Sequence, residues 1–178
     1  MREGDWEIRK IGKDTCSVER YLGSGTELVI PERIGSYQTV EIGAKLLKKT
    51  SKVRSLSIPR SIEYIDPEAF QSWRWMEGVK AEGKKLKSRD GVLYDGAFKS
   101  LVFYPPKKEG DLYEAPDTLR RVLPGAFSAT VPLRTFSFYG SFEEFSAKPS
   151  ECPRLECITA LESGKLSTSE GVLFKGKK

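Results

Sequence analysis

A three-residue apolar motif recurs along this chain at nearly even spacing, and it constrains the fold more than any other feature. Successive copies begin 28, 23, 34, 23 and 22 residues apart, at Leu28-Val29-Ile30, Leu56-Ser57-Ile58, Val79-Lys80-Ala81, Tyr113-Glu114-Ala115, Phe136-Ser137-Phe138 and Ile158-Thr159-Ala160. A repeat of roughly 20–29 residues with one short strand cannot bury its own apolar side, so neighbouring repeats must stack on it. The spacing therefore predicts a solenoid with a parallel sheet along one flank.

A second pattern supports the same repeat. Ile42 stands four residues before Leu46-Leu47, Ile65 before Ala69-Phe70, and Val122 before Ala126-Phe127. We expect the Leu or Phe of each pair to fill the interior of its coil, where burial contributes roughly 1.5–3 kcal/mol. The competing interpretation is an aromatic ligand site.

The longest interval between motifs contains extra sequence. The run from Ser88 to Gly96 is followed by Leu101-Val102-Phe103-Tyr104, with Asp95-Gly96 between two alternating stretches. Two such runs around a turn pair predict a β-hairpin, here near residues 90–104, that protrudes from the solenoid.

The two ends of the chain differ in pattern. Residues 1–20 alternate around a Gly12-Lys13-Asp14 turn, which predicts a cap hairpin that shields the first coil, with the solenoid in residues 21–178 as one domain. Residues 170–174 repeat the pattern of residues 90–94, but no partner strand follows before Lys178. We expect either a truncated repeat array or self-association through this C-terminal edge.

Several segments together resemble a known family. Gly23 to Pro31, Ser57 to Phe70, and Asp90-Gly91-Val92-Leu93-Tyr94 are similar to the BspA-like leucine-rich repeats of bacterial surface antigens. The resemblance covers about residues 21–174. It departs from the family pattern because the chain has no asparagine, and because Glu114-Ala115-Pro116 replaces an Ile-Pro step.

The resemblance implies an α/β leucine-rich-repeat solenoid, with a curved parallel sheet of about six short strands and with short helices or loops on the other flank. It further implies adhesion or protein binding, secretion or a place at the cell surface, and no catalytic residues. The chain contains no signal peptide and no apolar run near the ~20 residues of a membrane span, so a cytoplasmic location stays open.

Residue composition argues against an enzyme. The chain has no histidine, which removes the commonest general base and imidazole metal ligands. Carboxylate pairs such as Glu143-Glu144, or Asp66 with Glu68, would suit a glycosidase, but they fall in expected turns or a short helix with no pocket implied. Gly23-Ser24-Gly25-Thr26 lacks the lysine and the helix of a phosphate loop, so a turn into the first strand is favoured. We expect no cofactor, metal or small-molecule substrate.

Three cysteines are too few for a disulfide framework and lack zinc-site spacing. Cys152 occupies a repeat position and is expected to be buried, Cys157 falls on the outward strand face as a free thiol, and Cys16 lies in the cap. A bridge between Cys152 and Cys157 stays open. Of Trp73 and Trp75, one is expected to pack inward, while the alternative is an exposed aromatic anchor.

The net charge of +5 raises the question of nucleic acid. The lysine clusters at residues 45–52 and 80–89 fall mainly between strands, whereas the expected sheet face is mixed and slightly acidic. Such a face does not suit a phosphate backbone, whose affinity comes from many lysine and arginine contacts. Binding of an anionic surface or nucleic acid through the lysine-rich loops remains an alternative.

Repeat proteins bind partners on the extended surface that stacking creates. The function expected is therefore a noncatalytic protein-protein interaction or adhesion module with a protein partner, and the alternative is a structural spacer in a longer repeat array. The outward positions give the candidate partner-binding surface: Arg54, Ser55, Ser57, Glu77, Lys80, Arg134, Thr135, Ser137, Glu156 and Thr159.

Overall fold

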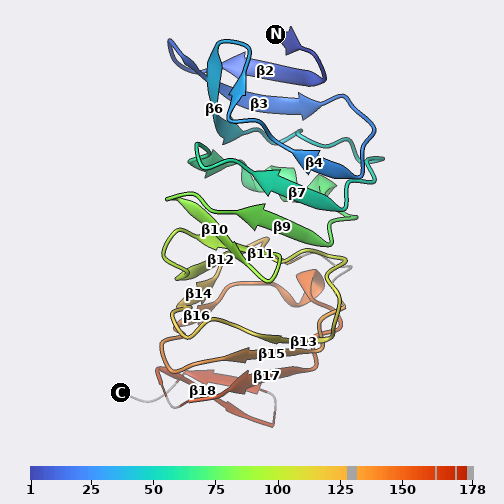
Figure 1. Cartoon of the computed structure of the whole chain (residues 1–178). Helices are drawn as coiled ribbons and strands as arrows, with labels where there is room; N and C mark the ends of the chain where they lie inside the picture. The colour runs from blue at the N-terminus through green and yellow to red at the C-terminus, as the bar shows by residue number, and fades with distance from the viewer. Residues whose placement is uncertain (128–131, 163, 171, 176–178) are drawn as a thin grey trace.

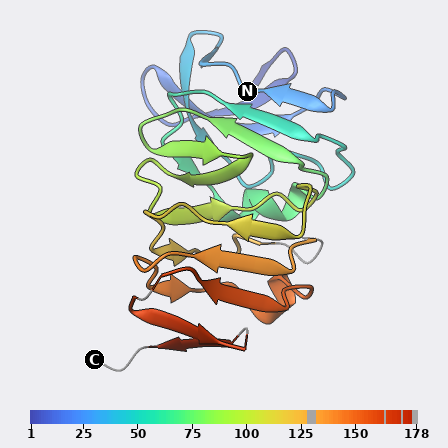
Figure 2. The same cartoon turned by 60° about the horizontal axis from the view of Figure 1, so that its bottom comes forward.

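The protein is an elongated solenoid of stacked coils, with β2 (Trp6–Lys10) at one end and β18 (Leu166–Ser169) at the other (Figure 1). The computed structural model describes residues 1–127, 132–162, 164–170 and 172–175. The strands run across the long axis of the stack, so each coil adds one layer (Figure 2). This arrangement confirms the solenoid that the motif spacing predicts.

The six expected motif strands are present on one flank, in two three-stranded parallel sheets. The first positions of the motifs face each other in register, Leu28 with Leu56 and Val79, and Tyr113 with Phe136 and Ile158. The strands are β4 (Glu27–Val29), β7 (Ser55–Ile58) and β9 (Gly78–Ala81) in one sheet, and β13 (Leu112–Glu114), β15 (Thr135–Phe138) and β17 (Cys157–Ala160) in the other.

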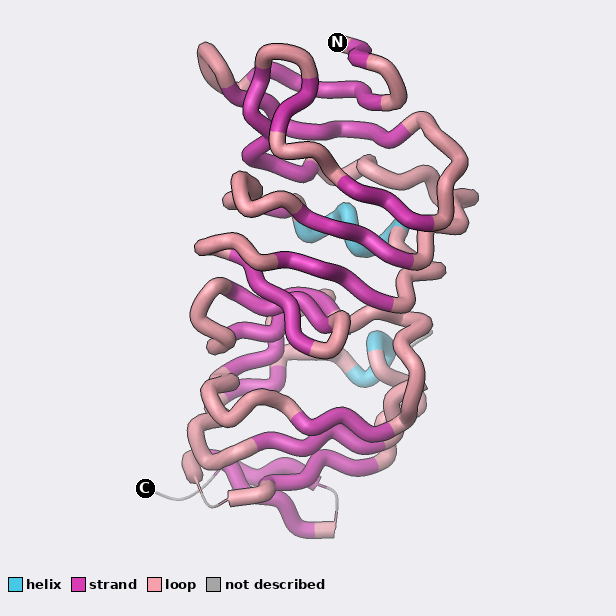
Figure 3. Tube along the Cα trace, viewed as in Figure 1, coloured by secondary structure: helices cyan, strands magenta, loops and turns pink. Residues whose placement is uncertain are grey.

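The opposite flank holds short strands as well as helical turns (Figure 3). Ile42 pairs with Ile65 there, which explains the second sequence pattern. The parallel strands of this flank are β6 (Tyr37–Ile42) with β8 (Tyr64–Ile65), and β12 (Ser100–Phe103) with β14 (Arg121–Val122) and β16 (Glu144–Phe145). In the described residues the helices are two 3-10 turns, η1 (Pro67–Ser72) and η2 (Pro149–Glu151), so the helical share of the fold is small.

The interior pairs pack as expected. Leu46, Leu47, Ala69 and Phe127 are buried, and the partly buried Phe70 stacks on Phe103 with ring centroids 4.8 Å apart. Aromatic pairs of this kind stabilise a core beyond the area they bury. The packing interpretation of these residues is therefore confirmed.

The N-terminal hairpin is present. It consists of β2 (Trp6–Lys10) and β3 (Thr15–Tyr21), with β1 (Arg2–Glu3) on its outer edge, and β3 pairs in parallel with β6. Ile8 and Val18 lie in the same hydrophobic cluster as the first coils. The extra residues of the first long interval form β5 (Arg33–Ile34), which turns back onto β6 through Gly35 at φ 59°.

The insertion near residues 90–104 forms a hairpin but does not protrude, which corrects the sequence-based prediction. β11 (Val92–Asp95) pairs with β12 on one side and with β10 (Leu86–Arg89) on the other, giving an antiparallel meander. The Gly91 carbonyl accepts a hydrogen bond of 2.9 Å from the Val79 amide, so the turn lies against β9. The insertion is buried because consecutive residues of β11 are apolar and both faces of the strand find a core to pack against.

The meander divides the interior into two hydrophobic cores. Side chains alternate across a strand, so Leu93 and Phe103 join the N-terminal core, whereas Tyr94 and Leu101 join the C-terminal core. The expected sheet of about six strands is split three and three for this reason.

Each core belongs to one copy of a larger repeating unit. β13, β15, β17, β18 (Leu166–Ser169) and β19 (Val172–Lys175) follow the order of β4, β7, β9, β10 and β11. The correspondence extends to details: the Ser88 hydroxyl accepts from the Ala81 amide at 2.9 Å, and the Thr168 hydroxyl accepts from the Ala160 amide at 3.0 Å. In the described residues β19 pairs with β18 alone, and self-association through its edge stays a prediction.

Candidate functional site

The ten predicted surface residues lie on one flank in two patches. The first patch, on the β4-β7-β9 sheet, holds Arg54, Ser55, Ser57, Glu77 and Lys80, and the second, on the β13-β15-β17 sheet, holds Arg134, Thr135, Ser137, Glu156 and Thr159. The β10-β11 hairpin lies between the two sheets in Figure 1. The structure therefore brings the residues of each patch together but separates the two patches.

The same ion pair occurs at the amino edge of each patch. Arg54 pairs with Glu77 at 3.3 Å, and Arg134 pairs with Glu156 at 2.7 Å. Each glutamate amide also donates to the carbonyl of its arginine, at 2.7 and 2.9 Å. Exposed pairs of this kind contribute little to stability, so these side chains are free to exchange their partners.

Ser137 is the one residue among the ten that is not on the surface. It is only 6% exposed, although strand alternation places it on the outward face. It lies between Glu114 and Thr159 in register, and the Tyr139 hydroxyl donates to Glu114 beside it. The longer side chains around Ser137 shield it, which corrects its prediction as a contact residue.

Sequence reasoning missed two apolar members of this face. Val29 is 68% exposed in the row of Ser57 and Lys80, and Leu112 is 64% exposed in the row of Thr135 and Cys157. Apolar residues in a strand are usually buried, so their residue type does not predict this exposure. Their alternation with the buried Leu28 and Tyr113 is the sequence signal that places them on the outward face.

A shallow groove of about 400 Å³ runs across the carboxyl ends of β4, β7 and β9. Val29 and Pro59 give it apolar walls. The charges at its rim are balanced, because Arg60 forms an ion pair with Glu82 at 3.1 Å and the Arg60 amide donates to Glu32 at 3.0 Å. We call it the first groove.

The corresponding groove of the second unit has different chemistry. It has a volume of about 380 Å³ and is lined by Arg89, Glu114, Ala115, Asp117, Tyr139 and Glu162. Three carboxylates face one guanidinium there, and the hydrogen bond to Glu114 raises the pKa of Tyr139. This second groove is acidic, whereas the first is balanced and more apolar.

The carboxylate pairs considered for catalysis have structural partners. Glu143 pairs with Lys165 at 2.6 Å and with Arg120 at 3.2 Å, which holds its pKa below the usual range. Asp66 accepts a hydrogen bond of 2.9 Å from the Glu68 amide as the N-cap of η1. Within the described residues, no three His, Cys, Asp or Glu side chains form a group suited to a metal ion.

The opposite flank carries a hollow of about 440 Å³ between the two units. Phe70, Phe103 and Phe127 line it, with Glu68 and Glu151 among its other lining residues. Trp73 is buried, and Trp75 is 46% exposed with the Lys107 ammonium 5.6 Å from its ring centroid. One tryptophan packs inward, as expected, and the other lies exposed in the turn that follows η1.

The cysteines follow their expected environments. Cys16 and Cys152 are buried, and burial raises the pKa of both thiols. Cys157 is half-buried on the outward face of β17, with its sulfur 3.3 Å from the Thr159 hydroxyl. All three are free thiols, so Cys152 and Cys157 form no bridge. No helix in the described part of the chain has the length and apolar character needed to cross a membrane.

Comparison with known proteins identifies the fold. No family model matches the sequence, and no curated protein matches it. A leucine rich cell surface protein from Faecalibacterium prausnitzii A2-165 aligns with a TM-score of 0.52 at 10% identity, over 93% of this chain and 76% of that one. The pneumococcal vaccine antigen PcpA gives 0.54 at 12% identity, over 91% and 70%, and the T. pallidum leucine rich repeat protein gives 0.56 at 18%, over 89% and 70%. The chain has the fold of these leucine-rich repeat proteins, which confirms the resemblance at the level of structure.

Proposed function

We propose that the chain is a noncatalytic protein-binding module whose outward face, over the β4-β7-β9 and β13-β15-β17 sheets, contacts a protein partner. The observation that carries the proposal is the exposure of Val29 on β4 and of Leu112 on β13, the corresponding strands of the two sheets, although the two residues lie in different rows. Exposed apolar side chains beside hydroxyls and paired charges match the anchor and rim of a binding surface. Repeat proteins use their extended faces in this way.

The different chemistry of the two grooves favours one orientation of the partner along the face. The first groove suits an apolar side chain beside Val29, and the acidic second groove suits a lysine or arginine beside Glu114 and Asp117. Adhesion at a cell surface is the setting that we propose, because one structural neighbour is a cell surface protein and another is a vaccine antigen. The duplicated unit also favours a second candidate, a structural spacer, in which the face binds nothing.

The test uses the Cys157 thiol to find the partner. A photoactivatable crosslinker on Cys157 captures proteins that touch the face, since Cys16 and Cys152 are buried. Binding of the captured partner is then measured with Arg54→Glu and Arg134→Glu. Arg120→Glu is the matched control, because Arg120 precedes β14 on the opposite flank and pairs with Glu143 in the same manner.

We expect Arg54→Glu and Arg134→Glu each to weaken binding about tenfold, because the new carboxylate repels a partner group that the arginine attracted. Arg120→Glu leaves binding unchanged, and all three variants change unfolding by no more than about 1 kcal/mol. Equal losses in the face variants and the control would place the contact elsewhere. Absence of any crosslinked partner would favour the spacer.

A further inference from the structure

Two sequence features that seemed unrelated meet in the folded chain. The glycine stretch at residues 23–25 and the lysine-rich turn at residues 48–52 line one pocket of about 270 Å³. It lies in the segments that precede β4 and β7, so it is on the opposite edge of the sheet from the first groove. We call it the amino-edge pocket; its lining residues are Tyr21, Gly23, Ser24, Gly25, Lys48, Thr50, Ser51 and Lys52.

The fold divides the lysine cluster into two pairs. Lys48 and Lys52 line the amino-edge pocket, whereas Lys45 and Lys49 line a separate hollow that contains Glu68. No carboxylate lines the amino-edge pocket, and neither of its lysines forms an ion pair in the described part of the chain. Its positive charge is therefore uncompensated by the protein.

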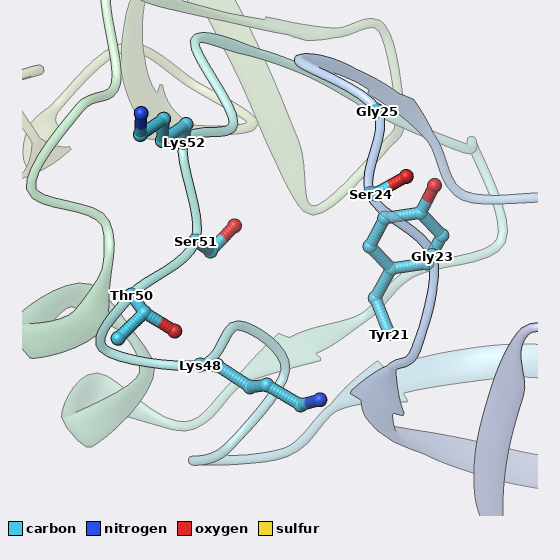
Figure 4. A pocket seen from close by; sticks show the side chains of 8 residues that line it. All are labelled: Tyr21, Gly23, Ser24, Gly25, Lys48, Thr50, Ser51 and Lys52. Carbon is cyan, nitrogen blue, oxygen red and sulfur yellow. The ribbon is translucent and has the colours of Figure 1, made fainter.

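Polar side chains lie on both walls of the pocket (Figure 4). Thr50 and Ser51 direct their hydroxyls toward the wall of Tyr21, whereas the Ser24 and Tyr21 hydroxyls point away from Thr50 and Ser51 in this view. Lys48 extends its ammonium toward the wall of Tyr21, while Lys52 is turned away from the pocket. Hydroxyls and an ammonium together supply the hydrogen bonds that an oxyanion accepts.

Local packing holds these groups in place. The Tyr21 ring lies 5.1 Å from the Trp6 ring and directly over Gly23, where an added Cβ would come within 2.2 Å of the tyrosine oxygen. Across the pocket, the Ser51 amide donates to the Lys48 carbonyl at 2.9 Å, which closes the turn. The glycine is needed so that Tyr21 can pack there.

The glycine wall adds backbone donors. In the described residues, the amides of Gly23, Ser24 and Gly25 donate to no backbone acceptor, whereas the neighbouring Leu22 amide bonds to Asp5 at 2.8 Å. These amides are therefore open to an acceptor from a ligand, although Gly23 and Gly25 lack the left-handed conformation of an anion-binding nest. The segment lacks the helix of a phosphate loop, so the recognition here depends on a turn and a lysine from the next coil.

We propose that the amino-edge pocket binds a tetrahedral oxyanion group, the phosphate or sulfate ester of a larger molecule. Lys48 supplies the charge, and the hydroxyls of Thr50 and Ser51 orient the oxygens. This site is independent of the protein-binding face, because it shares none of the ten residues of that face.

The test is titration of the isotope-labelled protein with inorganic phosphate and, separately, inorganic sulfate, with chloride holding the ionic strength constant. We expect saturable amide shifts confined to residues 21–25 and 48–52. Lys48→Gln should raise the dissociation constant about tenfold or more, as expected for loss of a charge-assisted hydrogen bond. Lys84→Gln is the matched control, with the same loss of charge in the exposed loop before β10.

Shifts that do not saturate, that spread over all lysine-rich loops, or that Lys48→Gln and Lys84→Gln weaken equally would overturn the proposal. Ser51→Ala gives an independent check, since it leaves the charge intact and should still weaken binding. A sugar phosphate and a sugar sulfate, titrated in the same way, distinguish the two sources of the group by which binds more tightly.

Discussion

Leu93 and Tyr94 are consecutive residues of β11, yet their side chains lie in two different hydrophobic cores. Both are fully buried. Because alternate residues of a strand point to opposite faces, the strand acts as a wall that both units pack against. The two halves of the molecule therefore share backbone hydrogen bonds in the meander while their apolar contacts are largely separate.

The shared wall predicts that a cavity on one side will loosen that side first. Leu93→Ala should lower the free energy of unfolding by about 2–5 kcal/mol, as for other buried leucines. Native-state hydrogen exchange should accelerate more at β7 and β9 than at β13 and β15. Tyr94→Ala should give the reverse order. Equal acceleration on both sides in each variant would show that the cores open as one unit.

The buried tyrosines of the C-terminal core predict a loss of stability in alkali. The Tyr94 and Tyr113 hydroxyls are hydrogen-bonded to each other. Burial raises the pKa of Tyr113 to about 12, and it also raises the pKa of Tyr94 and Tyr104. The folded state therefore keeps protons that the unfolded state begins to lose near pH 10.

This contribution to stability is fully present below about pH 10 and is lost as the pH rises toward and through the folded pKa of each group. We expect the unfolding free energy to fall by up to about 1.4 kcal/mol per pH unit for each tyrosine. Urea unfolding between neutral pH and about pH 12 measures the slope. Tyr94→Phe should be less stable at neutral pH by about 1–3 kcal/mol, because Tyr113 loses its partner, and its slope should be shallower. An unchanged slope would contradict the assignment.

The environments of the three cysteines predict that only one of them reacts rapidly with a thiol reagent in the native protein. Cys157 is half-buried, whereas Cys16 and Cys152 are buried with raised pKa values. Since the thiolate is the reactive form, a thiol reagent should label Cys157 rapidly in the native protein and the other two only after unfolding. Mass spectrometry of the timed reaction measures the order. Rapid native labelling of Cys16 would mean that the cap hairpin opens.

The backbone packed against Gly96 leaves no room for a side chain at this position. A Cβ there would lie 1.8 Å from the Lys84 carbonyl oxygen, and backbone cannot move aside as a flexible side chain can. Gly96→Ala should destabilise the protein by about 1–3 kcal/mol. Gly25→Ala, where the nearest atom would be 3.4 Å away, is the control and should change stability far less. Thermal unfolding of the Gly96→Ala and Gly25→Ala variants measures the difference. Similar unfolding midpoints for the two variants would contradict the expected clash at Gly96.

The sequence by itself determined the position of the strand in each coil and which of its residues face the core. Motif spacing located all six strands, and alternation within them separated buried Leu56 from outward Ser57. The Asp95-Gly96 pair also marked a turn, and the turn follows β11 there, before β12 begins at Ser100. These features depend on geometry within a few residues, which a sequence reports directly.

Only the tertiary structure determined which residues from different coils lie next to each other. Whether the Val92-Leu93-Tyr94 run protrudes or becomes a wall depends on apolar surfaces that other coils present to it. The shielding of Ser137 depends on the lengths of side chains in neighbouring strands, and the meeting of Gly23 with Lys48 depends on the stacking of two coils. Such contacts join residues more than 20 positions apart, and periodicity along the chain carries no information about which of them will touch.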